Sequence, residues 1–150
     1  LGICSKPPSF CMVMEYLENG SLESYVKNHN LTETELVDIT RGIAAGMYHL
    51  ACEKIVHRDL AARNILMGHG GVPKVSDFGM SRVLVSEEEG QTQSFIGPIK
   101  WMAPESLLSR EYSEKSDVWS FGIVLWEITH KSLPHPNVPL LDAAIMIRGG

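Results

Sequence analysis

Residues 55–66, with the sequence IVHRDLAARNIL, place polar and charged side chains inside a strongly apolar stretch. Asp59 is followed five residues later by Asn64, and Ile, Val and Leu residues flank the pair on both sides. Charged side chains are seldom found in such a run unless they are paired or take part in chemistry. Taken alone, Asp59 is more simply explained as a capping or ion-paired carboxylate, so a catalytic role depends on further motifs.

Three motifs follow one another in an order typical of one enzyme family. Residues 57–64 fit the pattern H-R-D-L-x-x-x-N, in which the Asp is Asp59 and the Asn is Asn64. The triplet DFG stands at 77–79, and the triplet APE stands at 103–105. The chain therefore resembles the C-terminal, large lobe of a eukaryotic protein kinase, and the resemblance covers essentially all 150 residues.

This resemblance implies an α+β, mostly α-helical, protein-kinase-like fold. In it, residues 1–20 are the end of the small lobe and the hinge strand, and residues 21–150 are the large lobe. The sequence starts at Leu1 rather than Met, and it shows none of the family's Gly-rich loop, strand Lys or helix Glu. We therefore expect a fragment, incomplete at both ends, with negligible phosphotransferase activity and poor solubility by itself.

The resemblance also implies a chemistry for the first two candidates. Phosphoryl transfer has a loose transition state, so an enzyme contributes mainly positioning and charge compensation. By the resemblance, Asp59 orients the acceptor hydroxyl and accepts its proton, and Arg63 and Asn64 complete the catalytic set. Asn64 and Asp77 are implied to hold Mg²⁺, which takes oxygen ligands, and ATP is the implied phosphoryl donor. Five apolar neighbours are expected to anchor the loop: Ile55, Val56, Leu60, Ile65 and Leu66.

A second group of residues is similar to the nucleotide-binding hinge of the family. In the stretch VMEYLENGSL, the backbones of Glu15 and Leu17 would hydrogen-bond adenine, with Met14 behind it as a large gatekeeper. Plain core packing is the simpler explanation of Met14, and the two are compatible. Leu66 resembles the residue that forms the floor under adenine.

Other matched positions have structural roles in the family. Asp117 resembles a buried Asp that ties the end of a helix to the backbone of the catalytic loop. Glu105 is expected to pair with an Arg beyond Gly150, and a buried carboxylate without that partner would be unfavourable. Three residues align with the hydrophobic spine that links the lobes: Leu1, His57 and Phe78.

Two features favour tyrosine over Ser or Thr as the acceptor and indicate the tyrosine kinase and tyrosine-kinase-like group. Arg63 stands four residues after Asp59, where Ser/Thr kinases usually carry a Lys nearer to the Asp. Pro98 and Trp101 stand in the segment that binds the acceptor, and such a platform packs against a phenol ring. The alternative is that Pro98 and Trp101 only shape the loop.

The activation loop departs from the tyrosine-kinase pattern, because no Tyr lies between Asp77 and Glu105. Arg58 would normally bind the phosphate that is added there. A constant negative charge from residues 87–89, EEE, could replace a phosphate, although such a run is more often a solvated face. The candidate phosphorylation sites are Thr92, Ser94 and Ser86.

Elements that position these residues are predicted from apolar spacing. The stretch 8–17 is predicted as a buried strand, and 21–30 as a short helix. Thr32 and Glu35 fit a capping box at the start of a longer helix. The apolar face of that helix consists of Leu36, Ile39, Ile43, Met47 and Leu50.

Further along the chain, the stretches 54–60 and 73–79 are predicted as short strands that pair across the turn at 67–71. Residues 86–97 are predicted to form an exposed, mobile loop. Residues 113–129 are apolar on nearly every side and are predicted as a buried helix. A proline-rich loop at 131–140 precedes a final helix, which begins at 141.

Composition is ordinary for one soluble domain, with 44% hydrophobic and 21% charged residues. The formal net charge of −5 and the lack of a basic stripe argue against any nucleic-acid partner beyond ATP. Cys4, Cys11 and Cys52 lack metal-binding spacing and are predicted to be reduced thiols in the cytoplasm. The longest apolar run, 118–128, is too short to span a bilayer and contains Glu127.

Two functional hypotheses remain. In the first, the chain is a piece of an active kinase that acts on protein substrates, either soluble or as the cytosolic portion of a receptor. In the second, it is a truncated, non-catalytic binding module. The presence of Asp59, Asn64 and Asp77 favours the first, because a scaffold has no physical need for all three.

Overall fold

The computed structural model describes residues 2–5, 11–83 and 98–149. Leu1, the predicted loop at 86–97 and the candidate phosphorylation sites therefore lie outside the described residues. The helices are α1 (Leu22–Asn28), α2 (Glu33–Cys52), α3 (Pro104–Leu108), α4 (Glu114–His130) and α5 (Leu140–Gly149). The strands are β1 (Gly2–Cys4), β2 (Cys11–Val13), β3 (Ile55–Val56), β4 (Ile65–Met67), β5 (Pro73–Val75) and β6 (Arg82–Val83). Single 3₁₀ turns are η1 (Ala62–Asn64), η2 (His69–Gly71), η3 (Phe78–Met80) and η4 (Ile99–Trp101).

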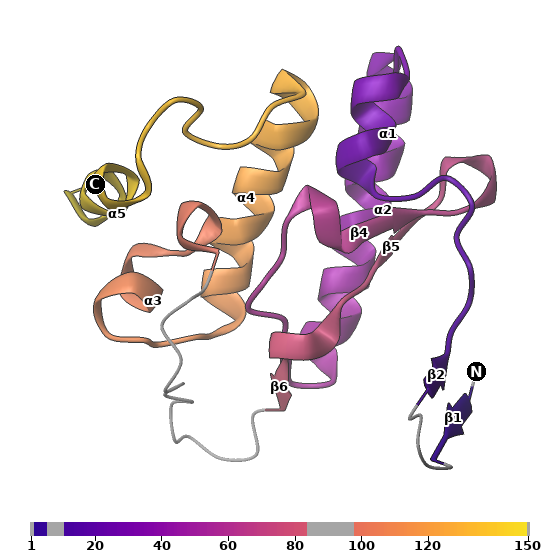
Figure 1. Ribbon diagram of the computed structural model, residues 1–150, viewed down its shortest axis with the longest axis horizontal. Coiled ribbons are helices and arrows are strands. Elements are labelled where there is room, and N and C mark those ends of the chain that lie inside the picture. Colours follow the sequence, from indigo (N-terminus) through magenta and orange to yellow (C-terminus); the bar gives the residue numbers. More distant parts are fainter. Residues whose placement is uncertain (1, 6–10, 84–97, 150) are drawn as a thin grey trace.

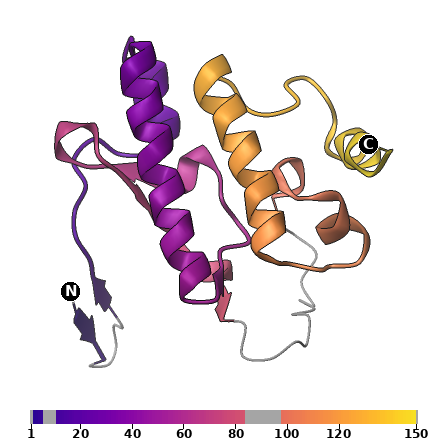
Figure 2. The same ribbon diagram turned by 180° about the vertical axis from the view of Figure 1, so that it is seen from behind.

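The two long helices form the frame of the molecule. Figure 2 shows α2 and α4 side by side, and they are in contact. The chain from β3 through η1 to β4 runs on the other side of this pair, as seen in Figure 1, and α1 packs on η1 and β4. Helices α3 and α5 lie together beyond α4, where α5 also packs on η4. A mostly helical fold with a few short strands is what the sequence predicts.

Local sequence signals begin the long helices. The capping box predicted for α2 is confirmed, because the Thr32 hydroxyl accepts the Glu35 N–H and the Glu35 carboxylate accepts the Thr32 N–H. Ser113 begins α4 in the same way, with Ser116 as the reciprocal partner. Both helices therefore begin where side chains satisfy their free N–H groups.

One core joins α1, α2, α4 and β4. Three residues of the predicted apolar face of α2, Ile39, Ile43 and Leu50, are buried, and the other two are partly buried against the core. The helix also approaches β5 closely at Gly42, where a Cβ atom would lie 2.6 Å from Cγ of Pro73. The buried members of this core are Leu22, Val26, Ile39, Ile43, Leu60, Ala62, Ile65, Met67, Val124 and Ile128.

The predicted strand pairing is wrong. Strand β5 pairs with β4 in antiparallel register, with Ile65 opposite Val75, and β3 pairs with β6. The turn η2 explains this, because Gly70 and Gly71 both have positive φ and reverse the chain directly between β4 and β5. Strand β3 is too far back along the chain to use that turn and pairs elsewhere.

Two predictions of burial are also wrong. Among the described residues, strand β2 pairs only with β1, in a hairpin that stands apart from the helices in both views, and Met12 is 68% exposed. Helix α4 is not buried all round, since Val118 is exposed and its inner face carries polar groups. Apolar composition indicates that a segment can be buried, but the neighbouring elements decide which face is covered.

Candidate functional site

The residues of the predicted catalytic loop are held in place by the main core. Val56, Leu60 and Ile65 are completely buried, as predicted, whereas Ile55 and Leu66 are partly exposed. Leu60 and Ile65 belong to the same core as α1 and α4. The polar residues between them therefore sit on a backbone whose apolar side chains cannot move freely.

Asp117 fastens the start of this loop from α4. Its Oδ2 accepts the His57 N–H at 2.7 Å, and its Oδ1 accepts the Arg58 N–H at 3.0 Å. Arg58 has a φ of 70°, a conformation that side-chain-bearing residues rarely adopt, so the two bonds hold a strained turn. Burial raises the pKa of the Asp117 carboxyl, against the lowering effect of both hydrogen bonds.

His57 links this loop to the segment that carries the DFG triplet. The ring is fully buried, its Nε2 lies 3.0 Å from the Ser76 carbonyl oxygen, and its Nδ1 accepts the Asp59 N–H. These partners place the ring proton on Nε2. The ring centroid also lies 5.4 Å from that of Phe78. A contact between these two rings agrees with the spine implied by the family resemblance.

The Asp59 carboxylate is held from two sides. Its Oδ1 pairs with the Arg63 guanidinium, and its Oδ2 accepts the Asn64 amide N–H at 2.9 Å. The Asn64 amide nitrogen also donates to the Asp59 carbonyl oxygen at 2.7 Å. Asp59 is thus oriented as a single carboxylate, and the Asn64 amide nitrogen is fully occupied.

The residue before Asp77 is tied to Asn64. Both the N–H and the hydroxyl of Ser76 donate to the Asn64 carbonyl oxygen at 2.9 Å. Asp77 itself is exposed and left-handed, with a φ of 61°, and its Oδ1 accepts the Gly79 N–H. The structure therefore brings the Asp77 segment and the Asp59–Asn64 pair into one network.

The donor set fits Mg²⁺. With the Asn64 nitrogen bound to Asp59, the Asn64 side-chain oxygen is the atom left for a ligand, and Asp77 supplies an exposed carboxylate. Mg²⁺ is usually bound by one or two protein oxygens together with phosphate oxygens and water. No group of three or more His, Cys, Asp or Glu side chains suited to a metal occurs among the described residues, and a two-ligand site does not need one.

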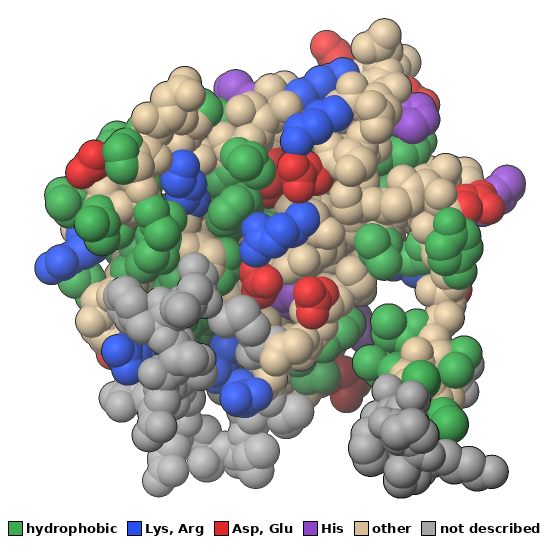
Figure 3. All heavy atoms as spheres, viewed as in Figure 1, with side chains coloured by type: hydrophobic (Ala, Val, Ile, Leu, Met, Phe, Trp, Pro, Cys, Tyr) green, Lys and Arg blue, Asp and Glu red, His purple; other side chains and the backbone are tan. Residues whose placement is uncertain are grey.

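Arg63 connects Asp59 to the predicted acceptor segment. Its guanidinium carbon lies 4.5 Å from the centre of the Trp101 ring, a cation–π contact. The Trp101 indole N–H donates to Glu127 Oε2 at 2.8 Å, and the same oxygen accepts the Ala62 N–H at 2.9 Å. On the face of the molecule that Figure 3 shows, acidic and basic side chains are mixed down the middle. Pro98, three residues before Trp101, is half-buried at the start of η4.

Glu127 is the functional neighbour that the sequence did not single out. It is 3% exposed, and burial raises the pKa of its carboxyl. A lone carboxylate in the apolar run 118–128 was a usable signal, because a buried charge needs partners. The partners themselves, Ala62 and Trp101, are distant in sequence and could not be named from it.

A Glu127→Gln variant should become relatively more stable than the unmodified protein as pH rises. Because the folded-state pKa of Glu127 is raised above its ordinary value near 4.5, its stabilising contribution is present at low pH and lost as pH rises through the folded pKa. Gln is neutral and still accepts both hydrogen bonds. We expect the gain at neutral pH to be about 1.4 kcal/mol for each unit of the pKa rise, measured by urea unfolding across pH.

The control for this variant is Glu53→Gln, which changes an exposed residue at the end of α2. Its stability difference from the unmodified protein should show no comparable trend. A difference for Glu127→Gln that stays constant with pH, or that grows as pH falls, would contradict the burial argument.

The predicted nucleotide contacts occupy another part of the structure. Met14 is 65% exposed, so the core-packing explanation is wrong. Both carboxylate oxygens of Glu15 pair with the Lys74 ammonium at 2.7 Å, and Leu17 and Glu15 line a hollow of about 320 Å³. Leu66, on β4, bridges to Ser21, just beyond this segment.

Two further expectations concern Arg58, with its candidate phosphorylation sites, and Glu105. Arg58 is buried, with its guanidinium 4.9 Å from the centre of the Tyr112 ring, and burial lowers its pKa. The activation-loop candidates Thr92 and Ser94 lie outside the described residues. Glu105 is half-buried rather than buried, which corrects that expectation.

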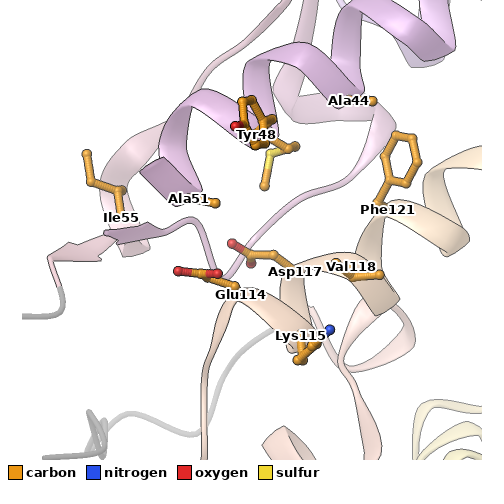
Figure 4. Close-up of a pocket in the computed structure, with 10 residues that line it drawn as sticks. Ala44, Tyr48, Ala51, Ile55, Glu114, Lys115, Asp117, Val118 and Phe121 are labelled. Atoms are coloured by element: carbon orange, nitrogen blue, oxygen red, sulfur yellow. The ribbon is translucent and has the colours of Figure 1, made fainter. Parts of the chain in front are cut away.

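A separate apolar hollow of about 300 Å³ lies between α2 and α4 (Figure 4). It is lined mainly by Met47, Tyr48, Val118 and Phe121, with the Asp117 carboxylate at its edge. Asp59, the predicted catalytic carboxylate, does not line it.

Within the described ranges, no helix combines the length and the apolar character that crossing a membrane requires.

Comparison with known proteins agrees with this geometry. The profile of the family described as protein tyrosine and serine/threonine kinase matches residues 1–150. The chain is 40% identical over 149 residues to human mitogen-activated protein kinase kinase kinase 13, covering 99% of the chain and 15% of that protein. It is 46% identical over 144 residues to rat ephrin type-A receptor 6, covering 93% of the chain and 14% of that protein.

A third relative is zebrafish ephrin type-A receptor 3, which is 47% identical over 131 residues, covering 85% of the chain and 13% of that protein. The chain thus spans about one seventh of the length of these relatives. The family profile matches residues 1–150, which include the whole hydrogen-bond network from the HRD segment to η4 and α4. The chain belongs to the protein tyrosine and serine/threonine kinase family.

Proposed function

We propose that this chain carries the catalytic loop of a protein kinase domain that transfers the γ-phosphoryl group of ATP to a protein hydroxyl, with tyrosine preferred. The observation that carries the proposal is the Asp59 carboxylate, held by Arg63 and Asn64 on a loop whose backbone is fastened by Asp117. Residues 21–150 would form the large lobe, and residues 1–20 the end of the small lobe and the hinge.

Asp59 is the proposed proton acceptor. A general base must be oriented towards the hydroxyl that attacks, and two fixed partners give this carboxylate one orientation. Asn64 and Asp77 would supply oxygen ligands to Mg²⁺, which neutralises charge on the phosphate oxygens during transfer. Because Ser76 bonds to Asn64, the two proposed ligands are positioned together rather than independently.

The nucleotide would be held by the segment that precedes α1. Its proposed contacts are the backbones of Glu15 and Leu17, with Met14 behind the adenine ring and Leu66 beneath it. The Glu15 side chain is already paired with Lys74, which leaves only its backbone for adenine. Segment 19–20 is fixed to β4, because the Asn19 N–H donates to the Met67 carbonyl and the Met67 N–H donates to that of Gly20.

The preference for tyrosine is carried by the Arg63–Trp101 contact. The Arg63 guanidinium and the Trp101 ring form a flat surface next to Asp59, against which an aromatic acceptor ring can pack. Pro98 begins the turn that presents Trp101. The family description covers both acceptor types, so the proposal rests on these residues. Arg58 would respond to a phosphate on Thr92 or Ser94, if either is modified.

A direct assay tests the acceptor preference. Because we expect negligible phosphotransferase activity from the chain by itself, the purified parent protein that contains it is given ATP, Mg²⁺ and matched peptides that differ only in having Tyr, Ser or Thr at one position. We expect kcat/KM for the Tyr peptide to exceed that for the Ser and Thr peptides by at least about tenfold, as pocket discrimination of this kind allows. Equal or better use of Ser would overturn the tyrosine preference, and no transfer to any peptide would favour the binding-module hypothesis.

A further inference from the structure

Two cysteines stand directly opposite each other in the β1–β2 hairpin. The antiparallel register sets Ile3 against Met12 and Cys4 against Cys11. Residues opposed in this way project from the same face of the pair. Both thiols are exposed and free. They are therefore close neighbours that small oxidants can reach.

The spacing of an antiparallel pair suits a disulfide. Opposed Cα atoms lie about 4.5 or about 5.5 Å apart, depending on whether the pair is hydrogen-bonded. Disulfides join Cα atoms that are about 4.4–6.8 Å apart, so both cases fall in the range. Opposed Cβ atoms lie about 4.5–5.5 Å apart, and a disulfide brings them to about 3.5–4.5 Å. The strands must therefore approach by about 1 Å. Figures 1 and 2 show that the hairpin stands apart from the helices, so no described helix is in the way of this movement.

We propose that Cys4 and Cys11 are a reversible redox modification site that closes to an intrachain disulfide. With hydrogen peroxide, one thiolate attacks a peroxide oxygen, which gives a sulfenic acid and, after protonation of the leaving hydroxide, water. The second thiolate attacks the sulfenic sulfur, the S–S bond forms, and the hydroxyl leaves as a second water. The two thiols are oxidised by two electrons, which the peroxide accepts. A dithiol reductant reverses the bond by thiol–disulfide exchange.

The location connects this site to the hinge segment. Cys11 lies three residues before Met14, on the strand that leads into the proposed adenine contacts. A disulfide would restrain the hairpin next to that segment. That consequence rests on the proposed function, whereas formation of the disulfide does not.

Cys52 provides a matched control within the same chain. It is also an exposed, free thiol, but it ends α2 and has no cysteine set against it by strand register. An oxidant that attacks every accessible thiol would modify all three residues alike. A site defined by strand register would form a disulfide between Cys4 and Cys11 and would leave Cys52 unlinked.

The test is peptide mapping of the purified full chain at about 10 µM, after oxidation with hydrogen peroxide and quenching with an alkylating reagent. Partners joined by a short segment have an effective concentration of about 1 mM, so the intrachain bond should exceed interchain bonds by about 100-fold. We expect Cys4 and Cys11 peptides linked by a bond that dithiothreitol releases, and Cys52 free of any link to them.

Variants make the assignment specific. Cys4→Ser and Cys11→Ser should each abolish the linked peptide, whereas Cys52→Ser should leave it unchanged; circular dichroism checks that all three remain folded. The proposal is overturned if Cys4 and Cys11 are alkylated or oxidised separately in the unmodified chain. It is also overturned if Cys52 is linked to either of them as often as they are linked to each other. Neither result depends on nucleotide binding or phosphotransfer.

Discussion

Replacing Asp59 with Asn should lower kcat for peptide phosphorylation by about 10²–10⁴-fold, the usual contribution of a positioned general base. Asn has the same shape, but its amide cannot accept the acceptor's proton. The Arg63 guanidinium can still bond to the Asn oxygen, so the fold should remain. The measurement is kcat and KM for ATP and for the Tyr peptide, made on the parent protein that contains this chain. We expect KM for ATP to change little, because the proposed adenine contacts are in another segment.

The matched control for this prediction is Asp38→Asn. Asp38 is also an acidic residue paired with an Arg, but its pair with Arg41 is on the exposed face of α2. Its variant should keep kcat near the unmodified value, since exposed ion pairs contribute little. If the Asp59→Asn and Asp38→Asn variants both kept full kcat, the assignment of Asp59 as the proton acceptor would be wrong.

Replacing Asp117 with Ala should lower the free energy of unfolding by about 2–4 kcal/mol, because two buried N–H groups lose their acceptor. These N–H groups belong to His57 and Arg58, so the strained turn before Asp59 loses its support. The release of a buried carboxylate, whose pKa burial raises, offsets part of the cost. We therefore expect kcat to fall as well, even at temperatures where the variant remains folded. Urea unfolding and kcat below the transition measure the two effects.

Asp117→Asn separates the two contributions. Asn retains one acceptor oxygen but turns an N–H₂ group towards the other backbone donor, so its loss of stability should lie between those of Ala and the unmodified protein. Asp38→Ala again serves as the exposed control, and we expect it to change stability by less than about 1 kcal/mol. An Asp117→Ala variant as stable as the Asp38→Ala control would show that the two hydrogen bonds do not hold the loop.

Most of the helical structure could be predicted because its signals are local. Thr32 and Glu35 specify the start of α2, and the spacing of Ile39 and Ile43 specifies its buried face. These signals act within one or two turns of a helix, so neighbouring residues contain all the required information. Strands β2, β3 and β5 lie within stretches that are predicted as strands, whereas β1, β4 and β6 are not predicted, and the strand partners could not be predicted from the sequence.

Pairing and burial depended on distant parts of the chain. Nothing within the stretch 8–17 reveals that β2 pairs with β1 and that Cys11–Val13 remain exposed. Strand β3 pairs with β6, which lies beyond both β4 and β5 in the sequence. Each of these outcomes is decided by which elements come together in space, and the apolar composition of a segment does not specify its partners.

The sequence by itself determined the family, and the family resemblance predicts the chemistry of the candidate site. The order of HRD, DFG and APE predicts Asp59, Asn64 and Asp77 as a set, because phosphoryl transfer needs oxygen donors of this kind. Only the tertiary structure decided how the set is held. Glu127 joins Ala62 to Trp101, and Ser76 joins Asn64 to the Asp77 segment, through hydrogen bonds between residues far apart in sequence. A motif records which atoms do chemistry, whereas packing of the whole chain determines which distant groups orient them.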